Sequence, residues 1–149
     1  MKGRVSKMIG ITIDEMTIGQ SASFTKTITE ADVVLYGGIS GDLNPAHFNE
    51  EHAKNTFFKG RIAHGMLVAS FISTVLGMHL PGPGTIYMKQ DLKFLAPVKF
   101  NDTVTATCSV KEINKEKNRV VLECSVVNQA GEDVIVGEAL VSPPKPPKS

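Results

Sequence analysis

The chain has 149 residues, of which 42% are hydrophobic and 21% are charged, and its formal net charge is +1. This length suits a single domain that buries a core of its own. The sixteen basic residues are matched by fifteen acidic ones and are scattered along the chain, which argues against a nucleic-acid partner, because such proteins concentrate positive charge. No apolar run follows the basic start at residues 1–4, so we expect no secretory signal and a cytoplasmic protein.

The first half of the chain predicts a strand and then a helix. Residues 21–28 alternate apolar and polar side chains, which is typical of a strand. Thr29 suits the N-cap of the following helix, because Asp32 can return the hydrogen bond of a capping box. The glycine pair at 37–38 weakens this helix, and the chain then enters segment 40–47.

Segment 40–47, with the sequence SGDLNPAH, is the most informative stretch of the chain. It places a carboxylate, Asp42, and an imidazole, His47, five residues apart in a segment bent by glycine and proline. The two side chains can converge on one small volume, which is the minimum needed to move a proton onto and off a substrate. The spacing alone leaves a second interpretation open, because Asp and Asn side chains also stabilise turns by binding local N–H groups.

The segment does not match a metal site. A calcium loop of the EF-hand type would need an oxygen ligand at Ala46 followed by a glycine. A transition metal would need more His, Cys or carboxylate ligands than the segment offers, and the four histidines of the chain are dispersed. We therefore predict that no metal is bound.

The apolar segment Ile62–His79 predicts a helix with apolar residues on every side. Its histidines and hydroxyl residues, and the lack of a second such segment, favour a buried helix over a membrane span. The other predicted helices are short, including one or two turns at 49–54 capped by Asn49. Only a curved antiparallel sheet could therefore cover the long helix.

The rest of the chain predicts that sheet. The periodicity changes to two from Thr85 onward, and Pro97 ends the first of these strands. Three further strands, joined as hairpins, are predicted at Thr103–Ile113, Arg119–Asn128 and Asp133–Ser142. The predicted fold class is α+β, with a long central helix wrapped by a curved antiparallel sheet.

The two cysteines, Cys108 and Cys124, indicate a reducing compartment rather than a disulfide scaffold. Both are equidistant from Glu116, so a hairpin centred there would place them opposite each other. We expect them to pack as small buried side chains.

A second candidate site lies at the start of the long helix, where residues 61–66 read RIAHGM. A helix N-terminus carries unpaired N–H groups and the positive end of the helix dipole, which favour a developing oxyanion. Gly65 has no side chain, so a substrate carbonyl can approach the backbone there. A need for close packing against the sheet would also explain a glycine at this position. His64 could equally be a hydrogen-bonded structural residue. Together the two sites supply what the addition of water to a carbonyl-conjugated double bond requires, with no metal or organic cofactor.

The chain resembles the MaoC-like (R)-specific enoyl-CoA hydratases, the hydratase-2 family. The resemblance extends over residues 16–141, and its core is Tyr36–His47, in which segment 40–47 fits the family motif position by position. Residues 64–67, 81–87 and 92–98 support it.

The resemblance implies reversible syn addition of water to a trans-2-enoyl-CoA, giving the (R)-3-hydroxyacyl-CoA. Asp42 and His47 would activate the water, Asn44 would orient the loop or the pair, and the Gly65 N–H would bind the thioester oxygen. Two alternatives stay open: a hot-dog thioesterase, and a non-catalytic module that binds acyl-CoA or acyl carrier protein.

Further substrate contacts are expected beyond these groups. Ser70 and His64 are predicted to bind substrate, although a helix serine equally bonds back to a carbonyl. Lys54, Lys59 and Arg61 could meet the phosphates of the thioester carrier or form a solvated rim. Acyl chain length and the choice between coenzyme A and acyl carrier protein stay open.

The resemblance also implies a domain plan and partners. Residues 16–142 would form the hot-dog domain, with an N-terminal extension at 1–15 and a disordered Pro/Lys-rich tail at 143–149. The expected partners are an acyl-CoA thioester and a second copy of the chain in a homodimer with sheets joined edge to edge. Neither nucleic acid nor a membrane is expected as a partner.

Overall fold

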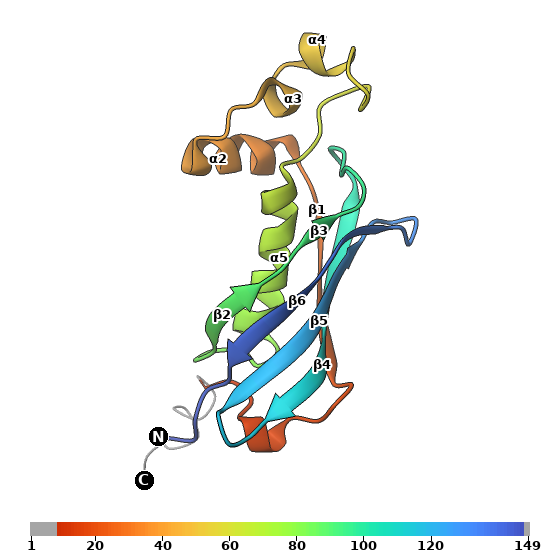
Figure 1. Ribbon diagram of the computed structural model, residues 1–149. Coiled ribbons are helices and arrows are strands. Elements are labelled where there is room, and N and C mark those ends of the chain that lie inside the picture. The colour runs from red at the N-terminus through yellow and green to blue at the C-terminus, as the bar shows by residue number, and fades with distance from the viewer. Residues whose placement is uncertain (1–8, 148–149) are drawn as a thin grey trace.

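A computed structural model describes residues 9–147 of the chain. The elements, in chain order, are η1 (Ile13–Glu15), β1 (Ser21–Thr27), α2 (Glu30–Ser40), α3 (Pro45–Phe48), α4 (Glu50–Ala53), α5 (Gly65–Met78), β2 (Ile86–Gln90), β3 (Lys93–Phe94), β4 (Thr103–Asn114), β5 (Arg119–Val127) and β6 (Asp133–Ser142). Figure 1 shows α5 lying along the sheet, with α2, α3 and α4 gathered beyond its N-terminal end.

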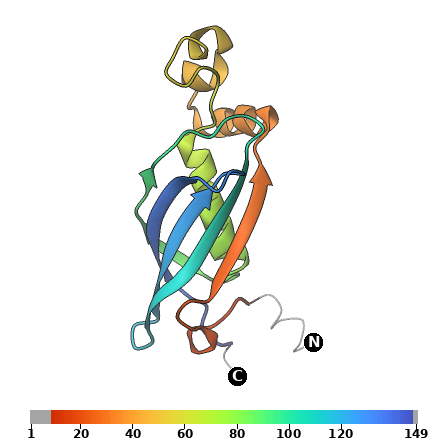
Figure 2. The same cartoon turned by 90° about the vertical axis from the view of Figure 1, so that its right-hand side faces the viewer.

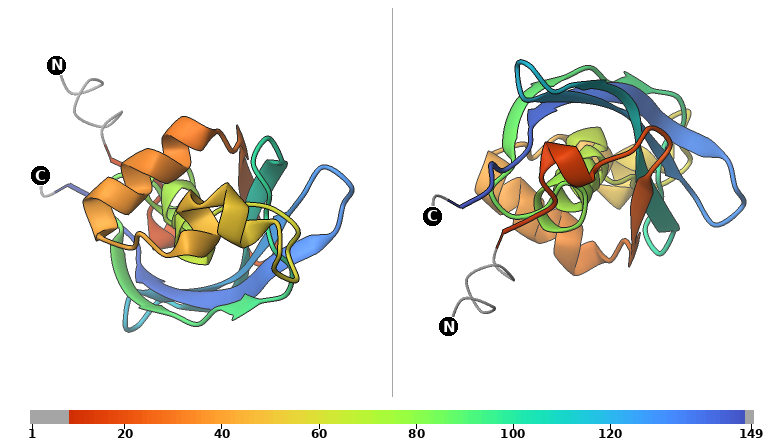
Figure 3. Two further views of the ribbon diagram at one scale, coloured as in Figure 1. Left: turned by 90° about the horizontal axis from the view of Figure 1, so that it is seen from above. Right: turned by 90° about the horizontal axis from the view of Figure 1, so that it is seen from below.

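The strands form one antiparallel sheet in the order β1-β4-β5-β6-β2, with β3 paired to β6. The sheet curves around one side of α5, as the end-on views of Figure 3 and the turned view of Figure 2 show. Along β4, Val104, Ala106 and Cys108 are buried against the helix, while the threonines between them are only half-buried. The predicted α+β class and the wrapped central helix are confirmed.

The long helix α5 differs from its prediction in two respects. It begins at Gly65 rather than Ile62, because Ile62 forms a β-bridge with Lys99 and the Ala63 N–H donates to the Val98 carbonyl at 2.8 Å. It is also not covered on every side. Seven of its residues are buried against the sheet (Leu67, Val68, Ala69, Phe71, Ile72, Val75 and Leu76), but Met66, Ser70, Ser73 and Gly77 form an exposed stripe. The open six-stranded sheet covers this helix on one side only.

No helix among residues 9–147 combines the length and the apolar character that crossing a membrane requires.

Helix α2 begins as predicted, with a capping box. The Thr29 hydroxyl accepts the Asp32 N–H at 3.1 Å, and the Asp32 carboxylate accepts the Thr29 N–H at 2.9 Å. An ion pair with Lys26 at 2.7 Å adds to this carboxylate's contacts and lowers the pKa of Asp32. The cap fixes where α2 starts, and α2 in turn leads the chain into segment 40–47.

The glycine pair at 37–38, which we expect to weaken α2, does not end it. The helix continues to Ser40 and ends at Gly41, whose φ of 79° is the left-handed C-cap conformation that favours glycine. Gly37 serves another element, because a Cβ there would lie 2.2 Å from Cζ of Phe48. The missing side chain makes room for the aromatic ring of α3.

The two cysteines lie opposite each other on β4 and β5, as predicted. Cys108 pairs in register with Cys124, both thiols are free, and their sulfurs are 3.7 Å apart. The hydrogen bond to Cys124 and burial both raise the pKa of the Cys108 thiol. The pair fills the core between sheet and helix.

The predicted terminal segments pack more than expected. Pro143 and Pro144 are buried, and the Asn118 side-chain amide donates to the Pro143 carbonyl at 2.9 Å, so the tail is held beyond its predicted start. In the N-terminal extension, the Gly10 N–H donates to the Pro83 carbonyl at 2.8 Å. The outer parts of both segments lie outside the described residues.

Replacing Thr29 with alanine removes the hydroxyl half of the capping box. We expect the free energy of unfolding to fall by about 1 kcal/mol, as for other N-caps. Urea denaturation of the purified protein measures the change. Thr29→Ser keeps a hydroxyl acceptor and should stay close to wild type, and equal stability of the alanine variant would contradict the role of this cap.

Candidate active site

Segment 40–47 is built from consecutive side-chain turns. The Ser40 hydroxyl accepts the Asp42 N–H at 3.1 Å, Asp42 Oδ1 accepts the Asn44 N–H at 3.2 Å, and Asn44 Oδ1 accepts the Ala46 N–H at 3.0 Å. Asn44 is thereby the N-cap of α3, with Pro45 at the first helical position. The interpretation that the Asp and Asn side chains stabilise turns in this segment is therefore correct. The single-turn helix α3 was not predicted from the sequence.

The same turns bring the carboxylate and the imidazole together. Oxygen and nitrogen atoms of Asp42, His47 and His64 lie within 4.8 Å of one another. Asp42 is exposed, whereas the His47 side chain is only 9% exposed. The acid–base interpretation is therefore also consistent with the geometry, and the two interpretations describe one structure.

A main-chain carbonyl selects the tautomer of His47. Its Nδ1 lies 2.7 Å from the carbonyl oxygen of Ile62, and because a carbonyl only accepts hydrogen bonds, Nδ1 carries the hydrogen. Nε2 of the neutral ring is then the free acceptor. A water molecule beside Asp42 could donate its proton there.

His64 lies behind this pair, in an aromatic cluster. Its ring stacks on His47 with centroids 3.9 Å apart, and the Tyr36 ring packs against it at a steep angle with centroids 4.8 Å apart. Its Nε2 donates to the Asp42 carbonyl at 2.8 Å, and among the described residues no partner faces its buried Nδ1. With 2% exposure, His64 supports the pair from behind, and its predicted contact with substrate stays a prediction.

The stacking also bears on metal binding by Asp42, His47 and His64. An imidazole nitrogen binds a metal ion in the plane of its ring, and the planes of the two rings differ by only 28°. Two nearly parallel stacked rings do not aim their nitrogens at one ion. The geometry therefore gives no support to a metal centre made from these three residues.

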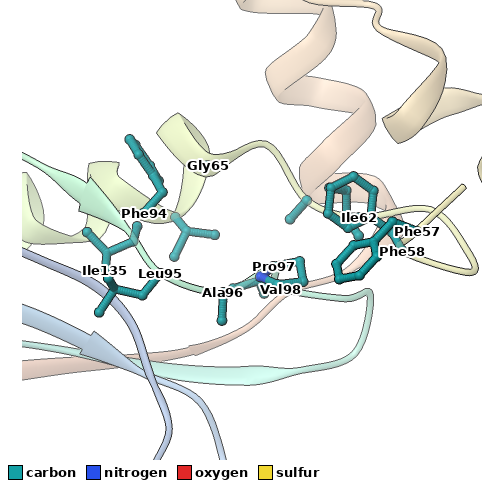
Figure 4. Close-up of a pocket in the computed structure, with 12 residues that line it drawn as sticks. Phe57, Phe58, Ile62, Gly65, Phe94, Leu95, Ala96, Pro97, Val98 and Ile135 are labelled. Atoms are coloured by element: carbon teal, nitrogen blue, oxygen red, sulfur yellow. The ribbon is translucent and has the colours of Figure 1, made fainter.

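Gly65 is the first residue of α5, so its N–H has no helical carbonyl to bind. A Cβ at this position would lie 2.8 Å from Cε1 of Phe94, which means that the glycine also serves close packing against β3. The residue borders an apolar cavity of about 470 Å³ (Figure 4). Phe57 and Phe58 line one side of this cavity, and Leu95, Ala96 and Pro97 line the other.

Ser70 lines a different pocket, of about 530 Å³, between α5 and β2. Tyr36, Met66, Ser73 and Tyr87 also line it. The Ser70 hydroxyl donates to the Leu67 carbonyl at 2.5 Å, the backward bond expected as its alternative role. The structure thus brings Asp42, His47 and His64 together but sets Gly65 and Ser70 on two separate pockets.

Two groups that hold His47 were missed by sequence reasoning. One is the Ile62 carbonyl, a main-chain atom with no side-chain signal. The other is Arg61, which we expect from the sequence at a phosphate or on a solvated rim; its side chain is 16% exposed and donates to the His47 carbonyl at 2.7 Å. Only the closeness of Arg61 to His64 and Gly65 in the sequence hinted at a role.

The fold that positions these groups is the hot-dog fold, in which an antiparallel sheet wraps a central helix. The sequence profile of the MaoC-like domain matches residues 14–131, and the chain belongs to the MaoC-like family.

Relatives and solved structures agree with this membership. The chain is 55% identical to an (R)-specific enoyl-CoA hydratase of Rhodospirillum rubrum, with 88% of this chain and 90% of the relative covered. It is 42% identical to a 3-hydroxybutyryl-CoA dehydratase of Methylorubrum extorquens, with 89% and 83% covered. The unliganded R-hydratase from Pseudomonas aeruginosa has a TM-score of 0.86 at 42% identity, with 94% of this chain and 96% of that chain covered.

The two stacked imidazoles should show opposite tautomers. We expect hydrogen on Nδ1 in neutral His47 and on Nε2 in neutral His64, because each of those nitrogens faces a carbonyl. Long-range ¹H–¹⁵N NMR spectra of labelled protein distinguish the two forms, with the exposed His52 and His79 as internal references. A signal for hydrogen on Nε2 of neutral His47 would contradict the assignment.

Proposed function

We propose that the protein is an (R)-specific enoyl-CoA hydratase, which reversibly adds water to a trans-2-enoyl-CoA. The observation that carries the proposal is the convergence of Asp42 and His47 on His64, the residue that directly precedes Gly65 at the start of α5. The names of relatives at 55% and 38% identity support it, since both are (R)-specific enoyl-CoA hydratases.

In the proposed reaction, Asp42 and Nε2 of His47 hold one water molecule between them. The water oxygen attacks Cβ of the enoyl group as the pair takes a proton from it. A proton reaches Cα on the same face, which makes the addition syn. Because the two groups share the proton, neither is assigned alone as the base.

Negative charge builds on the thioester oxygen during this attack. The N–H of Gly65, reinforced by the positive end of the α5 dipole, stabilises that charge. One such donor contributes about 3–4 kcal/mol to transition-state stabilisation in other enzymes. Asn44 acts indirectly, since its cap on α3 sets the distance between Asp42 and His47.

Asp42→Asn and His47→Ala should each lower kcat for hydration of crotonyl-CoA by roughly 10²–10⁴-fold, because each removes one member of the proton-transfer pair. The asparagine keeps an oxygen that can accept the Asn44 N–H, so the loop retains its shape. Loss of the enoyl-thioester absorbance measures the rate, and circular dichroism checks the fold. His52→Ala, at an exposed histidine of α4, is the matched control.

The same assay separates the competing activities. Product chirality must be (R), and free thiol must not accumulate. Release of thiol from a saturated acyl-CoA would indicate a thioesterase, and binding of enoyl thioesters from C4 to C12 without turnover would indicate a binding module. Retained hydration in both the Asp42 and His47 variants would overturn the proposed mechanism.

We further propose that the protein is a homodimer. Strand β2 ends the strand order, and among the described residues its outer edge pairs with no other strand. Next to it, Met66 of α5 and Ile86 and Met88 of β2 are 55%, 63% and 45% exposed, an apolar surface that a second copy would cover.

We also propose a cytoplasmic location, because the free, buried cysteines fit a reducing compartment.

Light scattering on the purified protein should give about twice the chain mass of 16.0 kDa. Met88→Lys should weaken association, because it places a charge in the apolar surface of β2. Ser23→Lys, on the exposed face of the opposite edge strand β1, serves as the control. A wild-type monomer at micromolar concentration would contradict the dimer.

A further inference from the structure

The catalytic imidazole lies on an element that cannot hold itself in place. Helix α3 has four residues, and His47 is the third of them. So short a helix is unstable alone, and the carbonyl groups of its last turn have no helical partners. The position of the His47 main chain must therefore be fixed from outside α3.

Arg61 supplies that contact. Its Nε donates to the His47 carbonyl at 2.7 Å, and its Nη1 donates to the Glu30 carboxylate of α2 at 2.5 Å. The guanidinium carbon lies 4.7 Å from the centre of the Phe100 ring. One side chain thus ties α3 to the first turn of α2 and to the segment before β4.

The next residue holds the same histidine by its ring. The Ile62 carbonyl accepts the hydrogen of His47 Nδ1, and the Ile62 N–H donates to the Ala46 carbonyl at 3.1 Å. Residue Ala63 is bonded in turn to Val98. Residues 61–63 therefore fasten both the main chain and the imidazole of His47 to the folded body of the protein.

We infer that Arg61 is a positioning residue, whose guanidinium aligns His47 with Asp42 for the proton transfer of the proposed hydratase reaction. The role rests on that proposed function and requires no contact between Arg61 and the substrate. A guanidinium can donate from Nε and Nη1 in two directions while stacking on an aromatic ring. A lysine ammonium at the same position cannot satisfy all three contacts.

The first test compares Arg61→Lys with Lys26→Gln. Both Arg61 and Lys26 form ion pairs with the first turn of α2, but only Arg61 also reaches His47. We expect Arg61→Lys to lower kcat on the order of 10–10²-fold with little change in KM, since small misplacements of a catalytic group are costly. Lys26→Gln should leave both constants near wild type. An unchanged kcat, or a change confined to KM, would overturn the inference.

A double-mutant cycle then asks whether Arg61 acts through His47. In the His47→Ala background, Arg61→Lys should cause almost no further loss of the residual rate, because the group it aligns is already absent. A full, additive loss would mean that Arg61 acts directly on the substrate or through general stability. Glu30→Gln, which loosens only the Nη1 contact, should give a smaller loss of kcat in the same direction as Arg61→Lys.

NMR provides a readout that does not depend on hydratase activity. In wild type, the hydrogen-bonded Nδ1–H of His47 should be protected from exchange, and in Arg61→Lys it should exchange faster and its signal should broaden. If the wild-type protein hydrates no enoyl thioester but Arg61→Lys still changes the His47 signal, the proposed function is wrong and the role of Arg61 in aligning His47 is retained. An unchanged His47 signal in a folded Arg61→Lys protein would refute the alignment itself.

Discussion

The constraint on which the rest of the structure depends is the apolar character of α5. Seven of its fourteen residues are buried, and burying them requires a sheet that bends around the helix. The sheet covers one side of this helix, and the shorter helices of the fold pack near its ends. The N-terminal end, with its free N–H groups, is the one next to which α2, α3 and α4 gather (Figure 1). The proposed oxyanion donor and the acid–base pair therefore meet at that end as a consequence of how the core is covered.

The pair itself depends on main-chain atoms as much as on side chains. Asp42 is held through its carbonyl by His64 and through its carboxylate by the Asn44 N–H. The ring of His47 is held by the Ile62 carbonyl and its main chain by Arg61. Each of the two proposed catalytic residues is thus held by two hydrogen bonds. Fixing both the main chain and the side chain of a residue limits its conformations before any substrate arrives.

Much of this could be predicted from the sequence because the signals are local. The strand predicted at Asp133–Ser142 has the observed bounds, and the Thr29–Asp32 spacing located the start of α2. The Asp–His spacing and the glycine at a helix start identified the candidate site. What could not be predicted depends on partners distant in the chain. The Ile62 carbonyl has no residue-type signal, and the exposed stripe of α5 depends on how far one sheet can curve.

The space left by Gly37 has a practical consequence for anyone who wishes to make the protein more heat-resistant. Exchanging a helical glycine for alanine is ordinarily a safe way to gain about 0.5–1 kcal/mol. At Gly38 that choice is open, since nothing lies within 4 Å of the position where a Cβ would sit. At Gly37 the same methyl group would collide with the ring of Phe48, the residue that directly follows His47. The two adjacent glycines therefore have different roles. Gly37 leaves room for the Phe48 ring beside His47 at a cost in helix stability, whereas at Gly38 a Cβ would meet no neighbouring atom.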